Sequence, residues 1–81
     1  MNQQCGIVVK YFASLKEKLG RSEDYFTLTR SMTVSDVWAQ LNPELTPPEQ
    51  LKVAVNLDYV SWDWVVNPGD EVAFFPPVTG G

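Results

Sequence analysis

Residues 70–81 read DEVAFFPPVTGG, and this stretch decides how the rest of the chain is interpreted. In EVAFF, at 71–75, side chains alternate between two faces, so that Phe74 would lie on one side of a sheet and Phe75 on the other. The two prolines that follow cannot donate to a β-ladder, and they favour an extended, polyproline-like chain. The stretch therefore predicts a final strand that leads directly into an extended tail.

The tail suits insertion into a narrow channel. It consists of Pro76, Pro77, Val78, Thr79, Gly80 and Gly81. The two glycines have no Cβ, so another protein can approach a terminal carboxylate from any side. An enzyme that activates a carboxylate needs this access, because the carboxylate must attack a nucleotide phosphate to form an acyl-adenylate. We therefore expect a folded domain over 1–75 and a functional tail over 76–81. A frayed terminus is the alternative.

Upstream of the tail, the sequence predicts further strands and two helices. Apolar alternation indicates strands at 5–12, 24–29 and 51–56, a strand-like stretch at 59–66, and turns at NLD (56–58) and NPGD (67–70). A short helix is expected over 13–20. The clearest helix is TVSDVWAQL at 33–41, where Thr33 and Asp36 have the spacing of a capping box and the apolar residues form one stripe. This order predicts an α+β domain in which a helix packs on a mixed sheet.

Composition excludes several classes of function. The 81-residue chain has no histidine and a single cysteine, Cys5, which leaves no disulfide framework, no predicted metal site and no nucleophile paired with a histidine. Cys5 is interpreted as a small hydrophobic residue rather than a reactive thiol. Asp70 and Glu71 are adjacent on a strand and would face opposite ways, which does not suit paired acid–base chemistry. Trp62 and Trp64 are two residues apart, a spacing that allows them to share one face, and packing in the core or on the sheet is favoured over a ligand platform.

Charge and hydropathy bear on partners and location. The net charge of −4 argues against nucleic acid, and no apolar run is long enough to span a membrane. The N-terminus has no signal-peptide pattern, so a cytoplasmic location is expected. Residues 1–41 have a charge balance of +1 and residues 42–81 one of −5. The acidic half carries the tail, which indicates either ordinary solubility or electrostatic steering toward a basic partner.

These motifs together resemble a known family. DEVAFFPPVTGG, preceded by AVN (54–56), YVSWD (59–63) and NPGD, resembles the small sulfur-carrier subunits of molybdopterin synthase, in the MoaD/ThiS family of ubiquitin-like proteins. VVKYFASLKEKLG (8–20) and TVSDVWAQL resemble the same family. The resemblance spans most of the chain, and its last dozen residues are the most specific. It implies a ubiquitin-like β-grasp fold.

The resemblance also implies a reaction sequence. A ubiquitin-activating-enzyme-like adenylyltransferase would adenylate the carboxylate of Gly81 with ATP and magnesium, and a sulfur donor would convert it to a thiocarboxylate. The tail would then enter the molybdopterin synthase large subunit and donate sulfur to cyclic pyranopterin monophosphate. The catalytic side chains would belong to that subunit, in a heterotetramer, and this chain would bind no cofactor.

Three residues correspond to the partner-facing positions of this family: Phe12, Tyr59 and Phe75. Strand alternation independently places Phe12 and Phe75 on outward faces, whereas Tyr59 stands where the family more often has an aliphatic residue. Other clients fit the same fold, namely thiamine or tRNA thiolation and protein modification. A passive interaction domain with an incidental tail is a further alternative.

Overall fold

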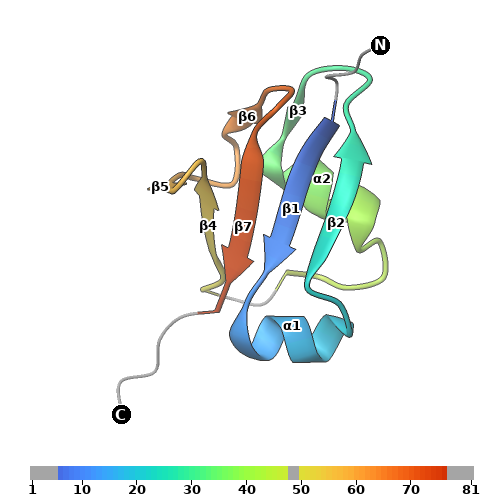
Figure 1. Ribbon diagram of the computed structural model, residues 1–81, viewed down its shortest axis with the longest axis vertical. Coiled ribbons are helices and arrows are strands. Elements are labelled where there is room, and N and C mark those ends of the chain that lie inside the picture. Colours follow the sequence, from blue (N-terminus) through green and yellow to red (C-terminus); the bar gives the residue numbers. More distant parts are fainter. Residues whose placement is uncertain (1–5, 48–49, 77–81) are drawn as a thin grey trace.

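A computed structural model describes residues 6–47 and 50–76, and it shows a mixed β-sheet with helix α2 packed across one face (Figure 1). In chain order the elements are β1 (Gly6–Tyr11), α1 (Ala13–Leu19), β2 (Glu23–Thr27), β3 (Met32–Thr33), α2 (Val34–Leu41), β4 (Lys52–Val55), β5 (Asp58–Tyr59), β6 (Val65–Val66) and β7 (Glu71–Phe75). The predicted α+β class and the four main strands are confirmed, with bounds shifted by one or two residues.

The last strand lies at the centre of the main sheet. The strand order is β2-β1-β7-β4-β5, so β7 is hydrogen-bonded on both sides. It runs parallel to β1 and antiparallel to β4, and β1 is antiparallel to β2. The sheet is therefore mixed, as predicted, and the first and last strands of the chain are neighbours.

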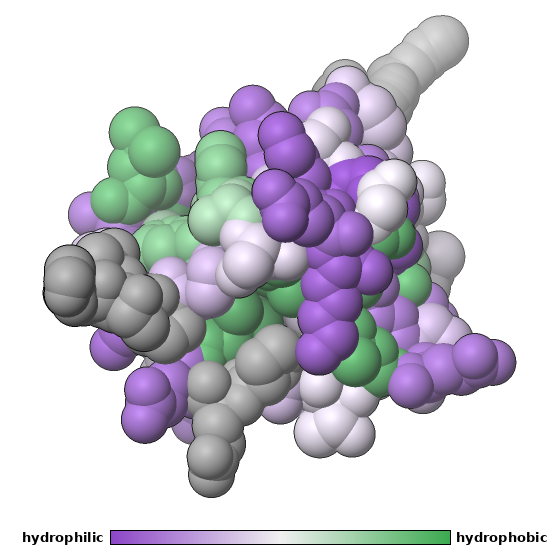
Figure 2. All heavy atoms as spheres, turned by 90° about the horizontal axis from the view of Figure 1, so that it is seen from below, coloured by the Kyte–Doolittle hydropathy of each residue, from purple (hydrophilic) through white to green (hydrophobic). Residues whose placement is uncertain are grey.

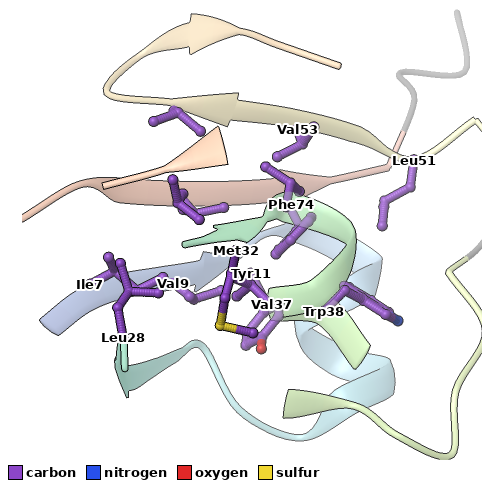
Figure 3. Packing of buried hydrophobic residues seen from close by; sticks show 14 of the residues in the cluster. Ile7, Val9, Tyr11, Leu28, Met32, Val37, Trp38, Leu51, Val53 and Phe74 are labelled. Atoms are coloured by element: carbon purple, nitrogen blue, oxygen red, sulfur yellow. The ribbon is translucent and has the colours of Figure 1, made fainter. Parts of the chain in front are cut away.

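The predicted alternation places the core on one face of the sheet. Ile7, Val9 and Tyr11 of β1 are each at most 1% exposed, and Phe74 of β7 is fully buried. Figure 3 shows these side chains packed together with residues of α2. The buried apolar cluster comprises Ile7, Val9, Tyr11, Leu15, Leu28, Met32, Val34, Val37, Trp38, Leu51, Val53, Val55, Val66, Val72 and Phe74. Alternate residues of β1, β4 and β7 belong to it, including Phe74, which was predicted to lie on the opposite face from Phe75.

Both helices begin or end where the sequence predicts. At the start of α2, Thr33 Oγ1 accepts a hydrogen bond from the Asp36 N–H (3.2 Å) and Asp36 Oδ2 accepts one from the Thr33 N–H (3.2 Å), a complete capping box. Helix α1 ends at Leu19, and its cap residue Gly20 has a φ of +76°, which suits glycine; the Gly20 N–H donates to the Lys16 carbonyl (2.9 Å).

A second, two-stranded sheet of β3 and β6 was not predicted. Met32 pairs with Val66 and Thr33 with Val65, which connects the start of α2 to the segment before β7. The shared face that the spacing of Trp62 and Trp64 allows does not form. Trp62 packs against the core, whereas Trp64 is 48% exposed. The cause is local, because residues 61–64 form a turn, in which the Trp64 N–H donates to the Ser61 carbonyl, and alternation does not apply there.

A polar network joins β1, β2 and the end of α2. The Tyr11 hydroxyl donates to Asp24 Oδ2 (2.9 Å), the same oxygen accepts from Arg21 Nε (2.7 Å), and another Arg21 nitrogen donates to Asn42 Oδ1 (2.7 Å). Asn42 Nδ2 donates to the Tyr11 hydroxyl (3.3 Å). Burial, reinforced by Asp24, raises the pKa of Tyr11, while the hydrogen bond to Asp24 raises the pKa of Arg21. This network secures the end of the sheet where α1 packs.

Candidate functional site: an aromatic patch at the base of the tail

The end of β7 has an inward and an outward aromatic side chain in succession. Phe74 is fully buried, and its ring centroid lies 5.0 Å from that of Trp38 and 5.4 Å from that of Trp62. Phe75 follows on the opposite face and is half-buried. Pro76 is the last described residue. The tail therefore starts from a strand end that is held in the core, beside an outward-facing phenylalanine.

Phe75 is at the centre of an aromatic patch, defined here as Phe12, Tyr59 and Phe75. Its ring centroid lies 6.4 Å from that of Phe12 in an edge-to-face arrangement, and 5.6 Å from that of Tyr59. Phe12 is 47% exposed and Tyr59 is 74% exposed. Three residues far apart in the sequence thus meet on the face of the sheet opposite α2. The outward direction predicted for Phe12 and Phe75 is confirmed, and their role as partner contacts stays a prediction.

Two alanines form the floor of the patch. Ala54 of β4 and Ala73 of β7 are paired across the strands, and together with the aromatic patch they line a hollow of about 230 Å³. Ala54 is only 8% exposed, although it lies on the outward face, because the neighbouring aromatic rings are much larger. At the border, Lys10 Nζ lies 3.6 Å from a carboxylate oxygen of Glu71. The patch is therefore apolar in its middle and charged at one edge.

Leu57 is a member of this surface that sequence reasoning missed. It lies at the tip of the β4–β5 hairpin, lines the same hollow and is 91% exposed. A signal was present in the sequence. The turn NLD has a leucine at a position where hairpins favour glycine, so the leucine serves no evident purpose in the turn itself.

The polar residues around the patch act structurally. The Asp70 carboxylate accepts from the Asn67 N–H (2.8 Å) and from Asn56 Nδ2 (2.9 Å), while Glu71 pairs with Lys10. Asp70 and Glu71 thus have separate partners, as their predicted opposite directions require. Within residues 6–47 and 50–76, no group of three potential ligands from His, Cys, Asp and Glu could hold a metal ion.

Most of the predicted tail lies beyond the described part of the chain. Pro77, Val78, Thr79, Gly80 and Gly81 are outside it, as is Cys5.

Seen from the end of the molecule where β7 stops, hydrophobic residues are exposed beside hydrophilic ones (Figure 2). None of the helices in the described ranges has the length and hydrophobicity required to cross a bilayer.

The sheet order, the helix across one face and the central last strand define a ubiquitin-like β-grasp domain, and known structures agree. SAMP1 from Haloferax volcanii superimposes with a TM-score of 0.77 at 26% identity, covering 94% of this chain and 99% of that one. The chain belongs to the ThiS family, whose sequence profile matches residues 9–81.

Curated relatives align with this chain over nearly their full length. The molybdopterin synthase sulfur carrier subunit of Escherichia coli is 40% identical over 84 residues, covering 93% of this chain and 99% of the relative. The human molybdopterin synthase sulfur carrier subunit is 30% identical, with coverage of 95% and 96%. The family predicted from the C-terminal motif is confirmed.

Proposed function

We propose that this chain is a sulfur carrier in molybdenum cofactor biosynthesis. Gly81 would be adenylated, converted to a thiocarboxylate, and inserted into a molybdopterin synthase large subunit to donate sulfur to cyclic pyranopterin monophosphate. The observation that carries the proposal is the 40% sequence identity to a protein that is named as such a carrier subunit. The alignment covers 99% of that protein. The match to the family runs through Gly81, the residue that would react.

The geometry of the described residues supports a carrier rather than a catalyst. The aromatic patch adjoins Pro76, so a protein that binds the patch also lies over the start of the tail. Apolar aromatic side chains are common anchors at the centre of protein interfaces. Docking on the patch would therefore place the tail at a fixed point of the partner, and the chemistry would take place there.

The proposed chemistry uses one reactive carbon. The Gly81 carboxylate attacks the α-phosphorus of ATP and releases pyrophosphate, with magnesium held by the activating enzyme. A sulfide equivalent from the sulfur donor attacks the acyl carbon and displaces AMP, which leaves a thiocarboxylate. In the synthase, the thiocarboxylate sulfur would bond to a carbon of the pterin precursor and displace an oxygen substituent there, and water would then cleave the bond between that sulfur and the acyl carbon, which returns Gly81 to a carboxylate. Each of these steps needs access to Gly81 and none needs a side chain of this domain.

Intact-mass spectrometry tests the proposal. Coexpression with the activating enzyme and the sulfur donor is expected to raise the mass by one exchange of oxygen for sulfur. The matched controls are deletion of Gly81 and omission of the activating enzyme, and both should abolish the shift. Absence of the shift in the complete system, or its persistence without Gly81, would refute the proposal.

A second candidate function is protein modification. The 26% identity to SAMP1 favours it, because SAMP1 stands for small archaeal modifier protein 1. In that case a lysine amine of a target protein would displace AMP from the adenylated Gly81 and form an isopeptide bond. Gly81-dependent conjugates in a cell extract, detected with a tagged chain, would support this function. Their absence while the thiocarboxylate forms would leave the carrier function alone.

A further inference from the structure

Leu57 adopts a backbone conformation that leucine normally avoids. Asn56 has a φ of +53° and Leu57 a φ of +74°, so both residues at the hairpin tip are left-handed. Asparagine tolerates this region, but a leucine side chain is crowded by its own carbonyl there, and glycine is the usual residue at the second position. The local conformation is therefore less favourable than that of an Asn-Gly turn.

The side chain gains no internal packing in return. At 91% exposed, Leu57 is the most exposed large hydrophobic residue in the described ranges. An apolar side chain in water and an unfavourable φ both disfavour leucine at this position. A residue that breaks local rules without a compensating contact in its own domain indicates a contact with something else.

The hairpin tip is nevertheless held firmly. The Asn56 N–H donates to the Glu71 carbonyl (2.9 Å), and the Asn56 side chain accepts from the Glu71 N–H (3.0 Å) and donates to Asp70 (2.9 Å). These bonds attach the tip to the start of the central strand. Leu57 is thus presented at a fixed place, on the rim of the hollow that Tyr59 and Phe75 also line.

We propose that Leu57 is a specificity-determining contact that inserts into an apolar pocket of the protein receiving the tail. The inference rests on the proposed function, and the occupant is the molybdopterin synthase large subunit. Leu57 lines the same hollow as the aromatic patch, and Phe75 of that patch directly precedes Pro76, where the tail begins. Exposed apolar anchors suit a lasting association between subunits better than a transient encounter, whose interfaces are smaller and more polar.

Two substitutions separate a binding role from a structural one. Leu57→Ala removes the apolar side chain and keeps the left-handed φ, whereas Leu57→Gly removes both the side chain and the crowding. Calorimetric titration of the full chain into the large subunit should show binding weakened about tenfold or more for both variants, as expected when a buried leucine contact is lost. Val65→Ala, an exposed aliphatic residue on the small sheet, is the control and should bind as the parent does.

The Leu57 substitutions should weaken binding without lowering the stability of the domain. The urea midpoint of Leu57→Gly is expected to stay equal to the parent's or rise, because the turn is relieved, and that of Leu57→Ala should be unchanged. A residue that only stabilised the fold would instead lower the midpoint when truncated. Weaker binding by a protein that is equally or more stable is therefore the supporting result.

The outcomes separate this inference from the proposed function. If the unmodified chain neither binds the large subunit nor acquires sulfur at Gly81, the proposed function fails. If it does both, and the Leu57 variants bind within about twofold of it, the Leu57 inference alone is overturned. If the variants bind the large subunit normally but are adenylated poorly, the occupant is the activating enzyme and the inference is likewise overturned.

Discussion

The two exposed tyrosines on the outward face of the sheet provide a matched test of the aromatic patch. Tyr59 on β5 is 74% exposed and Tyr25 on β2 is 75% exposed. They lie on strands at opposite edges of the sheet, and only Tyr59 belongs to the patch. Tyr59→Ala and Tyr25→Ala therefore remove the same side chain from the same face, at the same exposure, with different expected consequences.

The expected magnitudes follow from burial. About a quarter of Tyr59 is covered in the free domain, where its ring packs against that of Phe75, and such an aromatic contact contributes about 0.5–1.5 kcal/mol to stability. Burying the remaining ring under a partner would contribute about 1.5–3 kcal/mol, which corresponds to about 10- to 150-fold in Kd. Tyr25→Ala should change Kd by less than about twofold, because that ring stays in water.

Titration calorimetry against the large subunit measures binding, and urea unfolding measures the stability of each variant. The expected result is a large loss of affinity for Tyr59→Ala alone, with both variants remaining folded. Equal losses for the two variants would show that the partner covers the whole face or that the effect is non-specific. No loss for Tyr59→Ala, while the parent binds, would refute the assignment of the patch as the docking surface.

Three further predictions concern the fold itself. Phe74→Ala should cost about 3–5 kcal/mol in urea unfolding, because it removes a fully buried ring that packs against two tryptophans, whereas Phe75→Ala should cost much less. Asp36→Ala should lower thermal stability by about 1 kcal/mol through loss of the capping box. The pKa of Tyr11 is raised on folding, so the folded state keeps a proton that the unfolded chain releases above about pH 10. Stability should therefore fall as pH rises through that range, and Tyr11→Phe should flatten this fall, measured as urea midpoints from pH 8 to 11.

Each of these has a clear contrary outcome. Similar losses of unfolding free energy for Phe74→Ala and Phe75→Ala would contradict the assignment of the two phenylalanines to opposite faces. An unchanged melting temperature for Asp36→Ala would show that the helix start is held by the β3–β6 sheet instead. An equally steep loss of stability at alkaline pH in Tyr11→Phe would mean that another group causes the loss.

The elements governed by local periodicity could be predicted from the sequence. Alternation in β1 and β7 identified the inward and outward side chains, because a strand buried on one face enforces a period of two. The cap of α2 was predicted because Thr33 and Asp36 act within one turn of chain. Phe12 and Phe75 faced outward as predicted for the same local reason.

The elements that depend on contacts distant in sequence could not be predicted. Strands β3 and β6 have two residues each and form only because residues 32–33 meet residues 65–66. The network of Tyr11, Arg21, Asp24 and Asn42 likewise requires the finished fold. Trp62 and Trp64 do not share a face because the chain turns between them. Leu57 was missed because an exposed turn residue carries no periodic signal, even though its φ marks it once the structure is known.

The position of β7 between β1 and β4 has a mechanical consequence. A pull directed along β7 would act on a strand that is hydrogen-bonded on both sides, so it would load two ladders of hydrogen bonds in shear rather than break the bonds one at a time. Phe74 resists the same displacement, since sliding would remove its ring from its contacts with two indole rings. If a partner binds and releases the tail in repeated cycles, as the proposed function requires, this arrangement would keep the domain folded.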